Sequence, residues 1–173
     1  MDSKRIEKEM RQFELVLHYH FNQISWLAKA MRSVKIEVDG EGKNHDEYTN
    51  EGLATVGDTM LKSMISDMLY RDGITTKGAI TDAKKDIENN DTMHRLMLGE
   101  DWIKYSYNDL HFTMDNPPQH EKVVSKKHDP YVEAIVGAIY YDSNYDTTKR
   151  WVDKFLIPLL KKYCWYNHHC ISE

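Results

Sequence analysis

Residues 50–71 read NEGLATVGDTMLKSMISDMLYR, and this stretch decides the fold of the chain. Its apolar residues recur at intervals of three and four, at Leu53, Val56, Met60, Leu61, Met64, Ile65, Met68 and Leu69. That spacing is typical of an amphipathic helix, here of about six turns. Gly73 follows shortly afterwards, where a glycine commonly ends a helix. The stretch therefore predicts a long central helix.

Gly57 and Asp58 are neighbours in the middle of this helix. One interpretation is structural: the glycine lets a second helix approach closely, and the aspartate lies in solvent. The other is functional: the carboxylate is held beside the close approach because a site needs it. These two residues alone leave both interpretations open.

The rest of the chain also shows helical periodicity. Residues 4–31 predict one helix, in which His18 and His20 are packing residues rather than metal ligands. Residues 100–127 are irregular and predict a long loop. Further helices are predicted over 81–90, 91–98, 130–142 and 146–163. No segment alternates as a strand does, so the predicted fold class is all-α.

Size and charge exclude several classes of protein. The 173 residues predict a single domain over 1–173, with a C-terminal tail over 161–173. The net charge of −5 excludes a uniformly basic nucleic-acid-binding domain, so a polyanionic partner would have to meet local lysine clusters or metal ions. The sequence has no apolar run of membrane-spanning length and no signal peptide, which predicts a cytoplasmic protein.

Two extended motifs lie on two of the predicted helices. Residues 50–58 read NEGLATVGD, and residues 130–142 read PYVEAIVGAIYYD. The first resembles the signature helix of the ribonuclease III family, N-E-R-L-E-F-L-G-D. The second resembles the family's later helix, D-x-x-E-A-h-h-G-A-h-h-h-D, where h is an apolar residue. The order and separation of the motifs are similar too, so the resemblance covers roughly residues 12–160.

The resemblance implies the helical ribonuclease III endonuclease-domain fold, a two-fold homodimer, and cleavage of double-stranded RNA in RNA processing. Clustered carboxylates would hold a divalent cation, Mg²⁺ or Mn²⁺. Such an ion lowers the pKa of the attacking water and neutralises charge on the leaving oxygen. Because no double-stranded-RNA-binding domain follows, the resemblance is to a stand-alone ribonuclease III domain.

Carboxylates stand at three of the family's acidic positions. Asp58 and Glu133 are the expected metal ligands, and Glu51 is an outer residue that positions the site; these three are the expected catalytic residues. The departures from the family are at Ala54, Lys77 and Pro130. The first and the last of these positions carry direct metal ligands in the family, so the acidic cluster is partly degenerate.

Two other carboxylates could replace the lost ligands. Asp129 lies four residues before Glu133, on the same face of a helix, and is the expected third metal ligand. The same aspartate is a candidate N-cap, which would commit its carboxylate partly to the amides of the first turn. Glu88, on an intervening helix, is a further candidate that no family position supports.

Two functions stay open. The first is a divalent-metal-dependent endoribonuclease with a rearranged carboxylate cluster. The second is a non-catalytic descendant, an RNA-binding or dimer-forming module. The retained Gly-Asp and Glu-Ala pairs favour the enzyme, whereas the losses at Ala54 and Pro130 favour the module.

Two further groups of residues are candidates for binding. The best phosphate contacts that the sequence offers to double-stranded RNA are Lys84, Lys85, Lys122, Lys126 and Lys127. A possible zinc site near the C-terminus comprises Cys164, His168, His169 and Cys170. The spacing of these four matches no closed zinc pattern well, and the neighbouring Trp165 and Tyr166 favour packing of the last turn instead.

Overall fold

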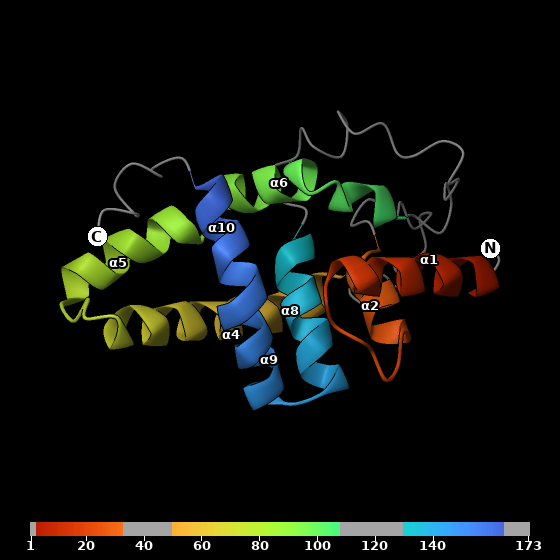
Figure 1. The fold of residues 1–173 in the computed structure, drawn as a ribbon, viewed down its shortest axis with the longest axis horizontal. Coiled ribbons are helices and arrows are strands. Elements are labelled where there is room, and N and C mark those ends of the chain that lie inside the picture. Colours follow the sequence, from red (N-terminus) through yellow and green to blue (C-terminus); the bar gives the residue numbers. More distant parts are fainter. Residues whose placement is uncertain (1–2, 33–49, 108–129, 165–173) are drawn as a thin grey trace, which may run out of the picture.

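The structure, a computed structural model, describes residues 3–32, 50–107 and 130–164 (Figure 1). Its helical segments are α1 (Ser3–Val16), α2 (Ser25–Ala30), α4 (Glu51–Arg71), α5 (Lys77–Ile87), α6 (Asn90–Gly99), the 3₁₀ helix η1 (Trp102–Tyr105), α8 (Tyr131–Asp142), α9 (Tyr145–Trp151), the π-helical turn η2 (Val152–Leu156) and α10 (Ile157–Tyr163). The described ranges contain no strand beyond one isolated bridge, between Arg32 and Tyr107. The all-α prediction is therefore confirmed.

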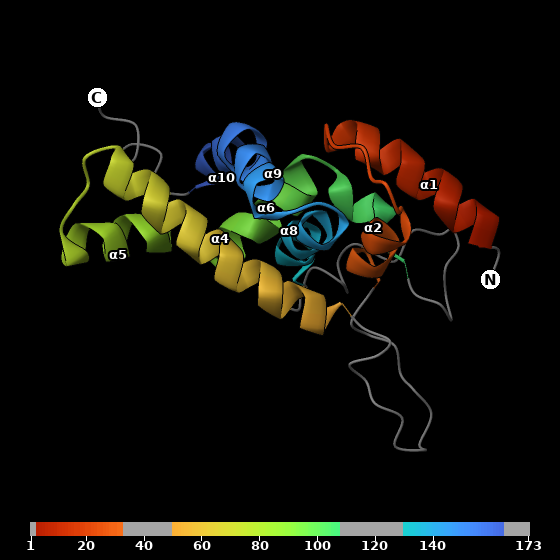
Figure 2. The same ribbon diagram turned by 90° about the horizontal axis from the view of Figure 1, so that it is seen from below.

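The long helix α4 and the shorter helix α8 cross and form the centre of the molecule (Figures 1 and 2). Along α4, the buried apolar residues are Leu53, Ala54, Leu61, Met64, Ile65 and Leu69, which follow the helical repeat. In α8, every residue from Tyr131 to Ile139 is buried, as expected for a helix that is apolar on nearly all sides. The predicted central helix and its end before Gly73, which has φ +95°, are confirmed.

Two glycines allow α4 and α8 to meet backbone to backbone. A Cβ atom on Gly57 would overlap the carbonyl group of Glu133 and lie 2.9 Å from the backbone nitrogen of Gly137. A Cβ atom on Gly137 would lie 2.5 Å from the carbonyl oxygen of Leu53. No other residue type fits at such distances, because every other residue carries a Cβ. The close approach suggested for Gly57 is therefore present, and it brings Asp58 near the first turn of α8.

The prediction of one continuous helix over 4–31 is wrong. Helix α1 ends at Val16, and α2 begins at Ser25. His18 has φ 53°, a left-handed conformation that cannot continue a right-handed helix. The ring of His18 contacts Phe155, with 5.2 Å between ring centroids, so the predicted packing contact is present, but the histidine itself is exposed.

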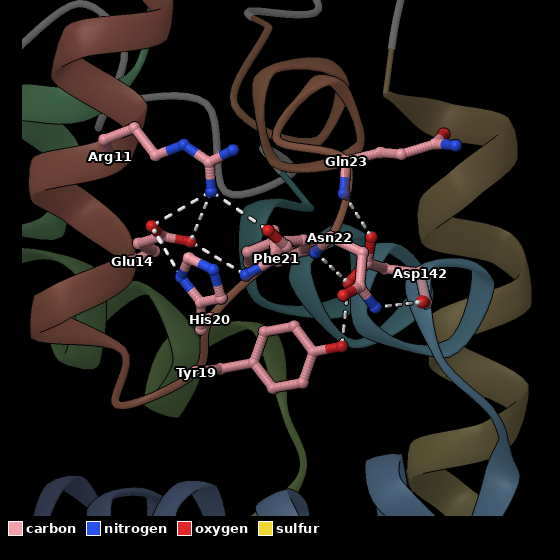
Figure 3. Close-up of polar contacts among 8 residues, drawn as sticks. All are labelled: Arg11, Glu14, Tyr19, His20, Phe21, Asn22, Gln23 and Asp142. Carbon is pink, nitrogen blue, oxygen red and sulfur yellow. Dashed lines mark hydrogen bonds and ion pairs between the residues drawn. The ribbon is translucent and has the colours of Figure 1, made fainter.

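Polar contacts hold the turn between α1 and α2 (Figure 3). The Glu14 carboxylate accepts a hydrogen bond from the Phe21 amide at 2.8 Å, and the Arg11 guanidinium donates one to the Phe21 carbonyl at 2.9 Å. His20 is largely exposed and contacts Glu14, so it is not the packing residue that was predicted. From the end of α8, Asp142 accepts hydrogen bonds from the Tyr19 hydroxyl and from the amides of Asn22 and Gln23.

The two helices after α4 begin earlier than predicted. Helix α5 begins at Lys77 rather than at residue 81, because the Thr76 hydroxyl accepts a hydrogen bond from the amide of Ala79. Helix α6 begins at Asn90, where the side chain of Asn89 accepts a hydrogen bond from an amide of the first turn. The junction between α5 and α6 therefore lies at residues 88–89, close to α4.

The predicted helix over 146–163 is observed as α9, η2 and α10, starting at Tyr145. Its irregular π-helical turn ends at Leu156, two residues before Pro158. Proline has no N–H to donate, so the regular hydrogen-bond ladder is interrupted at this point. None of the helices in the described ranges is both long enough and apolar enough to cross a membrane.

Candidate active site

An open pocket of about 720 Å³ lies where α4, α8 and the α5–α6 junction meet. Its charged and amide lining residues include Glu51, Asp58, Lys62, Glu88, Asn89 and Glu133. Three of these, Glu51, Asp58 and Glu133, are the residues that the sequence marks as catalytic. The structure thus places all three predicted carboxylates around one pocket, although they come from two helices distant in sequence.

Two of the three departures from the family motifs line the same pocket. Ala54, one turn after Glu51, and Pro130, at the start of α8, both line it. Two positions at which the resemblance implies metal ligands therefore line the pocket without offering a side-chain oxygen. Lys77 is exposed at the beginning of α5 and does not line the pocket.

Lys62 is a pocket residue that the sequence reasoning missed. Its ammonium donates a hydrogen bond to Oδ2 of Asp58 at 2.8 Å and lies 3.7 Å from Oε1 of Glu88. The hydrogen bond to Asp58 raises the pKa of Lys62. Lys62 follows Asp58 by four residues on α4, and this spacing was a sufficient signal to predict the ion pair. The contact to Glu88 joins two different helices and had no such signal.

Glu88, the candidate without a family position, also lies in the pocket. Its side chain is 7% exposed, and its Oε2 atom is buried without a hydrogen-bond partner. Burial raises the pKa of Glu88 to about 7; the positive charge of Lys62 opposes this rise, and the negative charge of Asp58 adds to it. A buried carboxylate with an unpartnered oxygen is destabilising unless something binds it.

Glu133 is the one acidic residue within the buried part of α8. It is 9% exposed, and burial raises its pKa to about 7. A backbone hydrogen bond opposes this rise, and the negative charge of Asp58 adds to it. Glu88 and Glu133, whose pKa values are both raised, therefore share the pocket with Asp58. A cation between these carboxylates would relieve the repulsion among their negative charges.

The donor chemistry of the pocket fits a divalent cation such as Mg²⁺. The carboxylates present hard oxygen ligands, and the unpartnered Oε2 of Glu88 lacks the contact that an ion would provide. The positions of these carboxylates in the structure are less suitable for binding a metal ion. Among residues 3–32, 50–107 and 130–164, no three Asp, Glu, His or Cys side chains lie close enough together to hold a metal ion. The ammonium of Lys62 stands beside Asp58 instead.

Several predicted binding residues lie outside the described residues, namely Asp129, Lys122, Lys126, Lys127, His168, His169 and Cys170. Of the proposed zinc ligands, Cys164 is described: it is buried, and its thiol donates a hydrogen bond to the Asp86 carbonyl at 3.0 Å. Lys84 and Lys85 lie in the last turn of α5. The positive charge of Lys84 opposes the rise in the pKa of Glu88, which indicates that this lysine lies near the pocket.

Comparison with known sequences gives consistent matches. A family model described as "Ribonuclease III domain" matches residues 51–144, more than half of the chain. Ribonuclease 3 of Fusobacterium nucleatum is 25% identical over 157 residues, which cover 90% of this chain and 63% of that protein. Ribonuclease 3 of Azobacteroides pseudotrichonymphae is 32% identical over 111 residues, covering 62% and 38% respectively. The chain thus spans less than two thirds of the length of these relatives.

A solved structure shows the same fold. The nuclease domain of ribonuclease III from Campylobacter jejuni, in a structure concerned with flexibility in the region involved in dimer formation, superposes with a TM-score of 0.65. The identity is 17%, and the match covers 89% of this chain and 97% of that domain. The family match includes both α4 and α8, the two helices that carry Asp58 and Glu133. The chain therefore belongs to the ribonuclease III family.

Proposed function

We propose that this chain is an endonuclease that hydrolyses double-stranded RNA in the pocket between α4, α8 and the α5–α6 junction. The observation that carries the proposal is the convergence of Asp58 and Glu133, with Glu51 and Glu88, on one open pocket. A domain kept only for its fold would gain stability by losing the buried carboxyl groups, because burial of an uncompensated charge is unfavourable.

Within this proposal, Asp58, Glu133 and Glu88 would hold a divalent cation, Mg²⁺ or Mn²⁺. The cation supplies Lewis-acid chemistry and a water of lowered pKa. Glu51, at the exposed end of α4, would orient groups at the pocket entrance through water. Asp129, two residues before the start of α8, stays the proposed additional ligand from outside the described residues.

The proposed substrate contacts are lysines near the pocket. Lys84 and Lys85 follow each other in the last turn of α5, four and three residues before Glu88 at the α5–α6 junction. A duplex whose scissile phosphate reached the pocket would bring neighbouring phosphates to this turn. Lys122, Lys126 and Lys127 are the other proposed contacts. Recognition would then depend on the shape and phosphates of an A-form helix rather than on base sequence.

A second function has its own support. Ala54 and Pro130 face the pocket without oxygen ligands, and Lys62 stands where a cation would approach Asp58. These observations favour a non-catalytic module that binds RNA or forms dimers. The charged pocket itself favours the nuclease, which is why the nuclease is the primary proposal.

The test is cleavage of a long RNA duplex by the full chain in Mg²⁺ or Mn²⁺, followed on denaturing gels. Asp58→Asn and Glu133→Gln are each expected to abolish cleavage, because each removes an oxygen ligand. Asp82→Asn, an exposed position on α5, is the matched control and should cleave at the wild-type rate. An inert wild type together with an active Ala54→Glu/Pro130→Asp variant would instead establish the non-catalytic module.

A further inference from the structure

We propose that Lys62 is the resident cation of the pocket, and that its ammonium must leave Asp58 before a divalent ion can bind there. The inference rests on the proposed metal site of the nuclease. It adds a competition between a side chain of the protein and the metal ion for the same carboxylate oxygens.

The geometry of the ammonium carries the first step. It lies 2.8 Å from Oδ2 of Asp58 and 3.7 Å from Oε1 of Glu88, so it is between a carboxylate of α4 and one of the α5–α6 junction. A Mg²⁺ ion would stand about 2.1 Å from the oxygens it binds. An ion on the same oxygens would therefore meet the ammonium at close range, where two positive charges repel. The two cations exclude each other.

Lys62 also differs from an ordinary ion pair on a helix surface. Asp67 and Arg71 have the same spacing on α4 and the same kind of contact, at 3.0 Å, but they lie outside the pocket, and Asp67 also contacts the ammonium of Lys149 at 3.1 Å. Pairs of that kind contribute little to stability. Lys62 has in addition Glu88, whose side chain is more than nine-tenths buried and has an unpartnered oxygen in the pocket wall.

The lysine is able to move. Its side chain is 46% exposed, and a lysine ammonium stands on a flexible four-carbon stem. It can therefore turn into solvent without disturbing the buried packing of α4. Movement of the ammonium away from Asp58 would leave Asp58 and Glu88 without the positive charge that now lies between them. That arrangement favours a divalent ion, and the free energy of displacing Lys62 lowers the apparent affinity for it.

The consequence concerns the metal affinity of the wild-type chain. At Ala54 and Pro130 the chain lacks two carboxylates that the motifs carry, so fewer carboxylates of the pocket need a counter-ion. The ammonium of Lys62 supplies part of the positive charge that the remaining carboxylates need. Wild type should then bind Mn²⁺ weakly, and removal of the ammonium should strengthen binding although no ligand is added.

The experiment measures Mn²⁺ binding to the full chain without RNA, by calorimetric titration and by the metal-induced change in melting temperature. Lys62→Met, which keeps the length of the side chain and removes the charge, is expected to bind Mn²⁺ at least tenfold more tightly than wild type. Its metal-free form should melt below wild type at neutral pH, and Mn²⁺ should raise its melting temperature, because binding to the native state alone is stabilising.

Three further variants make the result specific. Arg71→Met removes the equivalent charge outside the pocket and should bind Mn²⁺ as wild type does. Lys62→Arg keeps the charge and should also retain the wild-type affinity. Glu88→Gln combined with Lys62→Met should lose the gain. Lys62→Gln replaces Lys62→Met if the latter does not fold.

Equal Mn²⁺ affinities of wild type and Lys62→Met, or no binding by either, would overturn the inference. A gain of Mn²⁺ binding in a protein that never cleaves duplex RNA would support the inference and refute the proposed nuclease. Failure of this inference and failure of the proposed nuclease function are therefore distinguishable.

Discussion

At the scale of single residues, Glu133 shows how the pocket is related to stability. It lies on α8 among residues that are almost all apolar and buried, and burial raises its pKa to about 7. The ordinary value for this carboxyl group is 4.5. Because the folded protein binds this proton more tightly than the unfolded chain does, Glu133 stabilises the fold below pH 4.5. That contribution is lost as the pH rises through 7.

Glu133→Gln should therefore change the pH dependence of stability in metal-free buffer. At pH 8 we expect the variant to be more stable than wild type by on the order of 2 kcal/mol, because the amide carries no charge in the buried position. At pH 4.5 the two proteins should have nearly the same stability. Urea unfolding at both pH values measures the difference. A gain of the same size at both would show that charge is not its cause.

At the scale of the elements, the crossing of α4 and α8 determines the geometry of the site. Gly57 and Gly137 allow the two backbones to touch. Asp58 follows the first glycine directly, and Glu133 precedes the second by one helical turn. The carboxylates of the pocket are therefore positioned by the same contact that holds the centre of the fold together.

Gly57→Ala should destabilise the protein by about 3 kcal/mol, because the added methyl group would overlap the backbone of Glu133 and force the helices apart. Gly52→Ala is the control on the same helix. No atom lies within 4 Å of the Cβ it would add, so it should stabilise by about 0.5 kcal/mol through helix propensity. Thermal unfolding of both variants gives the comparison. Equal effects at the two positions would contradict the close crossing.

At the scale of the whole molecule, the pocket is open on one side, and several large apolar side chains remain at least a third exposed. These are Leu15, Val16, Tyr70, Leu98, Tyr141 and Tyr145. Exposed apolar side chains supply material for an interface between copies of the chain. The related Campylobacter jejuni nuclease domain has a region involved in dimer formation.

We expect the chain to form a C2 homodimer, the commonest closed symmetry. Light scattering at micromolar concentration should give a mass of about 41 kDa, twice the 20.4 kDa of one chain. The mass should fall toward that of one chain on dilution if the interface is weak. A mass of 20.4 kDa throughout would contradict the homodimer.

Much of the fold could be predicted from the sequence because helical periodicity is local. The run of apolar residues in 50–71 and the continuous apolar stretch after Pro130 mark the two central helices without knowledge of their partners. The same reasoning was wrong for residues 4–31. There the backbone turns into the left-handed conformation at His18, and Asp142, more than a hundred residues away, binds the turn that follows at Tyr19, Asn22 and Gln23.

The candidate site was likewise predictable from the sequence only in part. The motifs around Asp58 and Glu133 were sufficient to nominate both residues, because the chemistry of a carboxylate cluster is visible in residue types and spacing. Only the tertiary structure decided that Glu88 joins them and that Lys62 stands between Asp58 and Glu88. The physical reason is that burial and the approach of charges from different helices depend on packing, which no local pattern of residues contains.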